Sequence, residues 1–288
     1  MSAFDQANDI TLIEKAHNLE NSKEYTLENF VYAIRLLFKG DPRYSSGANK
    51  FIIRFQASNE SFNISTQALN LPNEDEKLYL NAIQIIKNKL KFNFGNYVSE
   101  FDVLKNLEIT LLTNISKFIN HSKPYLVNTL CSCYAIFFMI AFKTLPDLHK
   151  NFHSAIYSQS SNSNSFDLIK ARRATLNFYM SLAEVPFDKN IVVDKDHLIE
   201  YKSYLKSFEN EVIELLVASI QEASTILNAS PDEYIKSSRT ILSCLTSWLD
   251  LGFSASTMLI ISQKYKGLIE FVFSISEENL KLHRECIC

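Results

Sequence analysis

The chain has 288 residues, of which 47% are hydrophobic, and it carries a formal net charge of −3. This length and composition allow a continuous core, and the small charge excludes a strong bulk attraction to nucleic acid or to anionic membranes. Only five residues are glycine and six are proline. Glycine-rich loops that cradle phosphates are therefore scarce, which argues against most nucleotide-dependent enzymes.

Apolar residues recur at helical spacing along most of the chain, and the prolines fall between these stretches, where they do not break a helix. Residues 1–25 form a polar lead-in, for which partial helix is one expectation. The helices that the pattern predicts after it are, in chain order, 26–38, 48–57, 61–69, 74–93, 97–119, 124–141, 145–157, 166–184, 197–227, 231–249, 255–274 and a fragment from 277.

Several connections and helix starts can also be predicted. The tract SQSSNSNS over 158–165 is typical of a surface loop, and 185–196 is a longer connection. Ser122 can cap the helix that has Pro124 in its first turn, and residues 230–233 (Ser-Pro-Asp-Glu) have the pattern of a capping box. The apolar run over 130–142 is too short to span a bilayer, so we expect a buried helix there.

The first helices of successive pairs begin near residues 26, 74, 122, 166, 231 and 277. This spacing of roughly 45 residues, with one longer interval that contains the connection 185–196, is that of HEAT-type helical hairpins. We therefore predict an all-α fold in which residues 26–288 form a right-handed superhelical solenoid of about five HEAT-type repeats and the start of a sixth. A solenoid normally ends in a repeat with a polar outer face, but this chain ends within a predicted helix that has none. We therefore expect it to be the first part of a longer protein.

Two segments carry a resemblance to a known family. Residues 51–69 (FIIRFQASNESFNISTQAL) resemble the N-terminal signature of the importin-beta superfamily, although Ser61-Phe62 stands where the family usually has Ala-Trp. Residues 244–252 (CLTSWLDLG) resemble the Ser-Trp-x-x-Leu-Gly helix end of its transportin-SR and importin-thirteen branch, and residues 279–288 match that branch in character. The order of these segments along residues 26–288 supports the likeness.

The resemblance implies a nuclear transport receptor that shuttles between cytoplasm and nucleus. Its N-terminal repeats would bind the GTP-bound form of the small GTPase Ran, its concave face would hold protein cargo of an Arg/Ser-rich or basic kind, and its convex face would contact FG-nucleoporins. We expect no cofactor, no direct contact with nucleic acid, no membrane insertion and no enzymatic activity. Two alternatives stay open: a Ran-independent HEAT-repeat scaffold, and a helical enzyme whose catalytic group carries no recognisable motif.

In a HEAT solenoid the second helix of each pair lines the concave surface, so 97–119, 147–157 and 197–227 are candidate partner-binding faces. The polar positions on the first of these helices are Glu100, Lys105, Glu108, Asn114 and Lys117. The alternative for each of them is a solvated helix face, which any amphipathic helix has.

Residues 207–233 contain six carboxylates and no lysine or arginine. An acidic strip that includes Glu209, Glu211 and Glu214 would attract a basic cargo segment or a basic surface of Ran. The alternative is a chance run of charge on a solvated helix. Reversing these three charges to lysine tests the strip, because it should weaken partner binding at low salt.

Other motifs carry weaker signals. His149 and His153 are four residues apart and could hold a metal, but no third ligand lies nearby in the sequence, so we expect them to face solvent and predict no metal site. The basic cluster over 170–173 (Lys-Ala-Arg-Arg) is too short to indicate nucleic-acid binding. Trp248 should pack between repeats, and the cysteines are expected to be reduced thiols, those in the apolar runs lying in the core.

Overall fold

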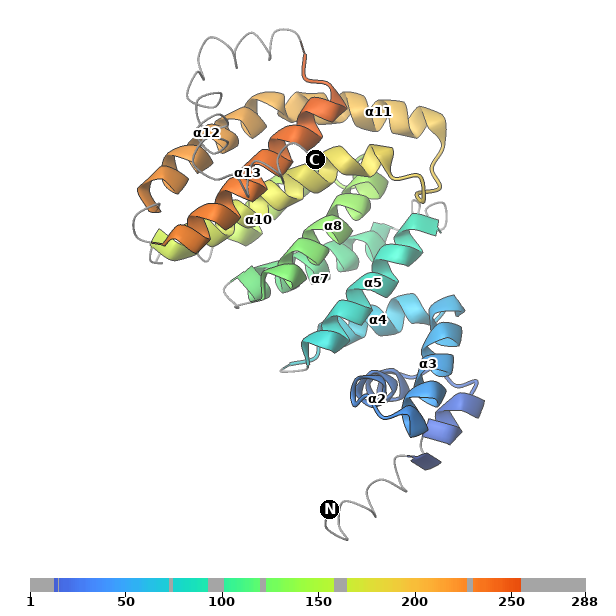
Figure 1. Ribbon diagram of the computed structural model, residues 1–288. Coiled ribbons are helices and arrows are strands. Elements are labelled where there is room, and N and C mark those ends of the chain that lie inside the picture. Colours follow the sequence, from blue (N-terminus) through green and yellow to red (C-terminus); the bar gives the residue numbers. More distant parts are fainter. Residues whose placement is uncertain are drawn as a thin grey trace.

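The computed structural model describes residues 13–14, 16–72, 75–92, 101–119, 123–157, 165–226 and 230–254. Over these residues the protein is helical and contains no strand, which confirms the predicted all-α class. Figure 1 shows the helices, whose bounds are α2 (Leu27–Phe38), α3 (Pro42–Ala57), α4 (Ser61–Leu69), α5 (Glu76–Phe92), α7 (Phe101–Ile119), α8 (Pro124–Ala141), α9 (Leu148–Tyr157), α10 (Ser165–Glu184), η2 (Val185–Phe187), α11 (Lys195–Leu205), η3 (Lys206–Phe208), α12 (Glu209–Ile226) and α13 (Pro231–Leu251).

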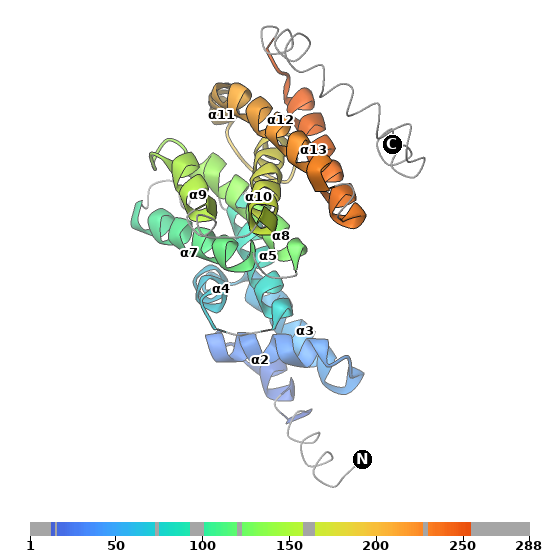
Figure 2. The same cartoon turned by 90° about the vertical axis from the view of Figure 1, so that its left-hand side faces the viewer.

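The helices follow one another through the molecule in the order of the sequence. The first helices of the predicted pairs are α2, α5, α8, α10 and α13, and each packs against the next. Of the remaining helices, α4 packs against α7 and α7 against α9, while α12 packs against α10 and α13. Figure 2 shows the result, with α2 and α3 at one end of the described part and α12 and α13 at the other.

Helix α8 forms the centre of this series, because it packs against α5, α7 and α10. Its residues are buried nearly all round, as the apolar pattern predicted. By length and composition alone it is also the one helix among the described residues that could cross a membrane, and 72% of it is buried inside the protein. Such burial is what the core helix of a helical protein shows.

The start of α3 differs from the prediction. The stretch 40–47 was expected to separate two helices, but the Asp41 carboxylate accepts the backbone N–H of Arg43 and Pro42 occupies the first turn, so the helix begins there. Gly47 then lies inside the helix, with the carbonyl oxygen of Ala16 only 2.7 Å from where a Cβ would be.

The expected lead-in over 1–25 is helical where the structure describes it before residue 22, at 13–14 and 16–21. Ala16 and Leu19 of this segment are buried and belong to the core. The lead-in is therefore in part a packed element, because its backbone at Ala16 lies against α3 where Gly47 has no side chain.

The C-terminal half shows two further corrections. The predicted helix 197–227 is interrupted by η3, which separates α11 from α12. The capping box at 230–233 does not form: the Ser230 side chain makes no capping bond, and the Glu233 carboxylate instead pairs with Arg173 of α10. Gly252 ends α13 as expected, with a left-handed φ of 88°. Ser122 and the elements predicted beyond residue 254 lie outside the described residues.

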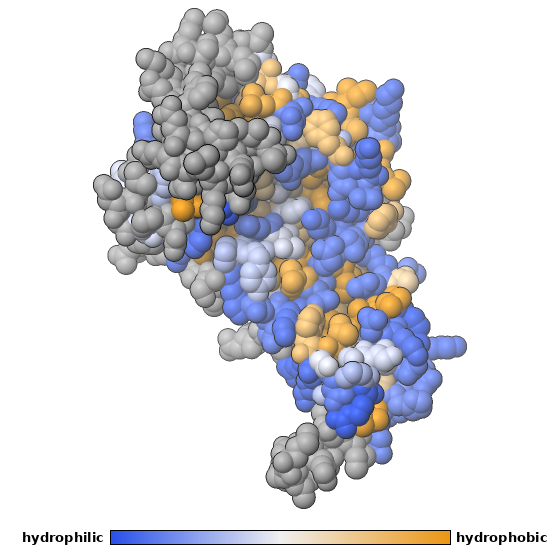
Figure 3. Space-filling model, in the orientation of Figure 1, coloured by the Kyte–Doolittle hydropathy of each residue, from blue (hydrophilic) through white to orange (hydrophobic). Residues whose placement is uncertain are grey.

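The described surface mixes polar and apolar areas. Figure 3 shows blue and orange regions interleaved along the length of the face that it presents. Four apolar side chains are exposed at or near the ends of α5, α10 and α11. Phe92 is at the end of α5, Phe187 and Val192 lie between α10 and α11, and Ile199 is on α11. The backbone N–H of Val192 donates to the carbonyl of Lys91 at 3.1 Å, which brings these two parts of the chain together.

Candidate functional site

The polar side chains of α7 are more buried, and make more hydrogen bonds inside the protein, than the sequence indicated. Glu108 is only 1% exposed, and its carboxylate accepts from Lys105 at 2.7 Å and from Asn151 of α9 at 2.8 Å. Asn114 is also buried and donates to the carbonyl of Thr110. The expectation that Glu108 and Asn114 present a polar surface is therefore wrong, since Glu108 helps to hold α7 against α9.

Lys117 contacts α5. Its ammonium lies 4.6 Å from the centre of the Tyr79 ring and donates to the Tyr79 hydroxyl at 3.2 Å. Lys105 keeps 43% of its side chain exposed although it pairs with Glu108. Glu100 lies outside the described residues.

The predicted acidic strip is largely neutralised by partners in the same chain. Glu209 is 6% exposed and accepts the backbone N–H of Ser254 at 3.2 Å. Glu222 lies 3.4 Å from Arg172, and Glu233 lies 2.8 Å from Arg173. Glu214 is exposed. The strip is thus no continuous free acidic surface, because the basic residues of α10, absent from 207–233 in the sequence, pack against it.

A compact polar cluster forms where α9, α10 and α12 meet. His149 and His153 lie one turn apart on α9, and their Nε2 atoms are 3.0 Å and 3.2 Å from the same Oε1 of Glu211 on α12. The Tyr179 hydroxyl of α10 is 3.2 Å from His153 Nε2 and also contacts His149 Nε2. We expected these histidines to face solvent, yet they turn inward because Glu211 lies across from them.

The surroundings of this cluster fix its charges. Burial opposes ionisation of Glu211, but hydrogen bonds from His149, His153 and Tyr179 outweigh it and lower the pKa of this carboxyl. Burial, and then the hydrogen bond and charge of Glu211, raise the pKa of Tyr179. The cluster therefore presents a carboxylate, a neutral phenol and two imidazoles within reach of one another.

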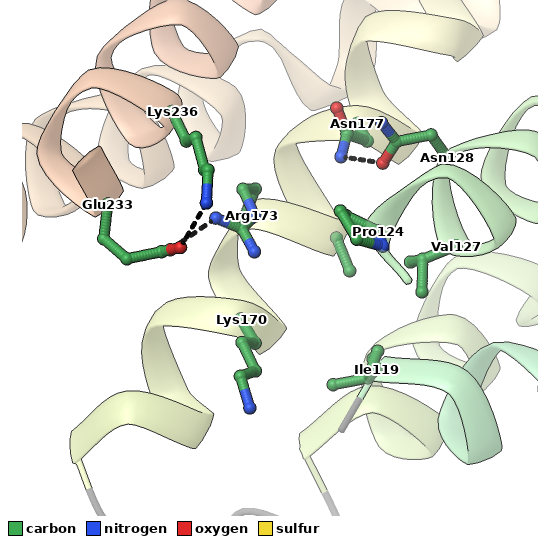
Figure 4. A pocket seen from close by; sticks show the side chains of 10 residues that line it. Ile119, Pro124, Val127, Asn128, Lys170, Arg173, Asn177, Glu233 and Lys236 are labelled. Carbon is green, nitrogen blue, oxygen red and sulfur yellow. Dashed lines mark hydrogen bonds and ion pairs between the residues drawn. The ribbon is translucent and has the colours of Figure 1, made fainter. Parts of the chain in front are cut away.

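A pocket of about 300 Å³ lies between α8, α10 and α13. Figure 4 shows Lys170 and Arg173 of the basic cluster in its wall, with Arg173 and Lys236 directed to Glu233. On the opposite side the Asn177 amide donates to Asn128 at 2.7 Å. Lys170 and Arg173 thus line a partly open recess, and Arg173 joins α10 to α13, which fits a structural use of this residue.

No family model matches the chain, and no curated protein matches it.

Proposed function

We propose that the protein is a nuclear transport receptor of the importin-beta type, related to the transportin-SR and importin-thirteen branch. Its helical hairpins would form a HEAT-type solenoid that binds GTP-bound Ran through the N-terminal repeats and helps to carry protein cargo between cytoplasm and nucleus. In this function the protein acts by binding partners along its surface and not by catalysis.

The observation that carries this proposal is the serial packing of the first helices. These helices begin at Leu27, Glu76, Pro124, Ser165 and Pro231, within two residues of the starts that the repeat spacing predicts. Each packs on the next along the chain, as repeats in a solenoid do. The two family-like segments fall in the first and the fifth of these units, which is the order that the resemblance requires.

Fewer of the candidate partner-binding residues are exposed than the sequence suggested. Among the α7 and α12 positions singled out from sequence, Glu214 is exposed and Lys105 is partly exposed, whereas Glu108 and Asn114 are buried. A basic cargo or a basic surface of Ran would meet Glu214 on α12. The exposed Phe92, Phe187, Val192 and Ile199 offer apolar contacts of the kind that FG-nucleoporins use.

A pull-down of this chain with GTP-locked and GDP-bound Ran tests the proposal. We expect capture by the GTP form and little by the GDP form. Glu214→Lys should weaken this capture, or the capture of a basic cargo peptide, several-fold at low salt, because it reverses an exposed charge. Asp250→Lys, at an exposed position of α13, is the matched control and should leave binding unchanged.

The alternative is a Ran-independent HEAT-repeat scaffold for a protein complex. Equal binding of the two nucleotide states, or no binding of either, would favour the scaffold and refute the transport function.

A further inference from the structure

We propose that His149, His153 and Glu211 bind a divalent transition-metal ion, zinc being the best match, with the Tyr179 oxygen at the fourth corner of the site. Among the described residues these three form a group whose ligand atoms all lie within 4.8 Å of one another. The site is independent of the proposed transport function, and its chemistry follows from the side chains alone.

The donor set fits zinc in type and in spacing. Zinc binds imidazole nitrogen at about 2.0–2.1 Å and carboxylate oxygen at about 2.0–2.2 Å, with tetrahedral geometry, so neighbouring donor atoms lie about 3.3 Å apart. The two Nε2 atoms are 3.0 Å and 3.2 Å from Glu211 Oε1, and the Tyr179 oxygen is 3.2 Å from His153 Nε2. An ion at their centre requires only a small outward movement of the donors.

Hydrogen bonds alone do not account for all the contacts in this cluster. Each Nε2 can carry one proton and the phenol one, while the ionised carboxylate carries none, so three protons are available. The structure has five close contacts among these groups: each Nε2 with Glu211, each Nε2 with Tyr179, and the Tyr179 hydroxyl with Glu211. A bound cation would attract all of these donor atoms at once, so their close approach would no longer require a proton between each pair.

The imidazoles are also held in place before any ion binds. The spacing of four residues puts both on one face of α9, as in helical zinc motifs. The ring of Phe208 lies 4.6 Å from that of His149, and the Tyr157 ring stacks on His153 at 5.9 Å. Such packing fixes the ring orientations and favours binding, because less side-chain freedom is lost.

Solvent access is intermediate, which suits a site that an ion must enter. The side chains of His149, His153 and Glu211 are 17%, 26% and 40% exposed. The donors come from α9 and α12, with Tyr179 on α10, so a bound ion would tie three helices that are separate in sequence. Zinc should therefore raise the melting temperature of the folded chain.

The test is zinc binding by the purified full chain in a Cys286→Ser/Cys288→Ser background, in which the terminal thiols cannot contribute ligands. We expect one zinc per chain by competition with a chromophoric chelator, and a visible Co²⁺ spectrum of four-coordinate type. His153→Gln and Glu211→Gln should each lower the affinity for zinc at least about 100-fold. Even the loss of a residue that only hydrogen-bonds to a metal ligand typically lowers metal affinity about 10–100-fold. Tyr179→Phe should change the Co²⁺ spectrum.

His17→Gln, at an exposed histidine outside the cluster, is the matched control and should bind zinc like the parent. Circular dichroism establishes that each variant is folded, and the zinc-dependent rise in melting temperature should be lost only in the cluster variants. Absence of stoichiometric zinc binding by the folded parent, or equal affinity in folded His153→Gln, would overturn the site and leave a hydrogen-bonded cluster.

Discussion

Single polar residues in this protein join helices that are far apart in the sequence. Lys91 at the end of α5 pairs with Asp188 at 2.5 Å, and Arg172 of α10 donates to the carbonyl of Ala218 on α12 at 2.9 Å. Contacts of this kind contribute modestly to stability one by one, yet they fix how neighbouring helices lie. Their charges also make part of the stability depend on pH.

Asp188 illustrates this dependence. Burial opposes its ionisation, but the hydrogen bonds from Lys91 and Asn190 prevail, so the pKa of the carboxyl in the folded protein is lower than its ordinary value of 3.8. Its contribution to stability is therefore present above 3.8 and is lost as the pH falls below that value. Asp188→Asn should cost about 1 kcal/mol of unfolding free energy near neutral pH, and less at about pH 3.

Urea unfolding of both proteins across this pH range measures the difference. Asp250→Asn, at an exposed position of α13, is the control and should change the unfolding free energy little. A cost of Asp188→Asn that stays constant down to about pH 3 would contradict the role of the ionised carboxylate.

At the scale of elements, the contact between residues 16–21 and α3 depends on the absence of a side chain at Gly47. In an ordinary helix interior, glycine to alanine would stabilise by about 1 kcal/mol. Here the new Cβ would lie 2.7 Å from the Ala16 carbonyl oxygen, a backbone atom that cannot move alone. Gly47→Ala should therefore loosen the segment 16–21, seen as faster amide exchange there by several-fold.

Ser46→Ala is the matched control, because it changes an exposed neighbour in the same helix and should leave exchange of the segment unaltered. Equal protection of residues 16–21 in Gly47→Ala and in the parent protein would show that the close approach does not hold this segment to α3.

The sequence predicts most helices because an amphipathic period is a local property: Ser61–Leu69 has the bounds of α4. The start of α3 was missed because Asp41 and Pro42 read as a break, although an aspartate cap followed by proline also opens a helix. The interruption at η3 was missed because Leu205 and Phe208 keep the helical spacing across it. Periodicity does not detect such a short change of helix type.

The site could be predicted only in part. The spacing of His149 and His153 is visible in the sequence, and it is the one signal that points to the cluster. Glu211 is on another helix, and only the packing of α12 over α9 brings its carboxylate to the two rings. The burial of Glu108 was hidden for the same reason, since its partner Asn151 belongs to α9.

At the scale of the whole molecule, the serial packing of the helices predicts that a substitution at one end destabilises the helices at that end and not those at the other. Trp248 is 1% exposed, and its indole N–H donates to the Tyr179 carbonyl at 3.0 Å, which joins α13 to α10. Trp248→Ala should cost on the order of 3–5 kcal/mol of local stability. Amide exchange should accelerate in α10, α12 and α13 and stay unchanged in α2, α3 and α4, because each unit is stabilised by its neighbours.

Leu249→Ala is the control, since this adjacent side chain is 44% exposed and its loss should alter exchange little. If Trp248→Ala accelerated exchange equally throughout the described helices, the protein would behave as one cooperative core, and the proposed repeat array would be refuted.

The buried position of α8 also has a consequence for the order in which the protein is made. Helices α5 and α7, which precede it, can cover two of its sides as soon as it emerges from the ribosome, but α10 follows later in the chain. Until α10 is synthesised, an apolar side of α8 lies open to other chains. The time between the synthesis of α8 and that of α10 is therefore the stage at which this protein is expected to benefit most from a chaperone.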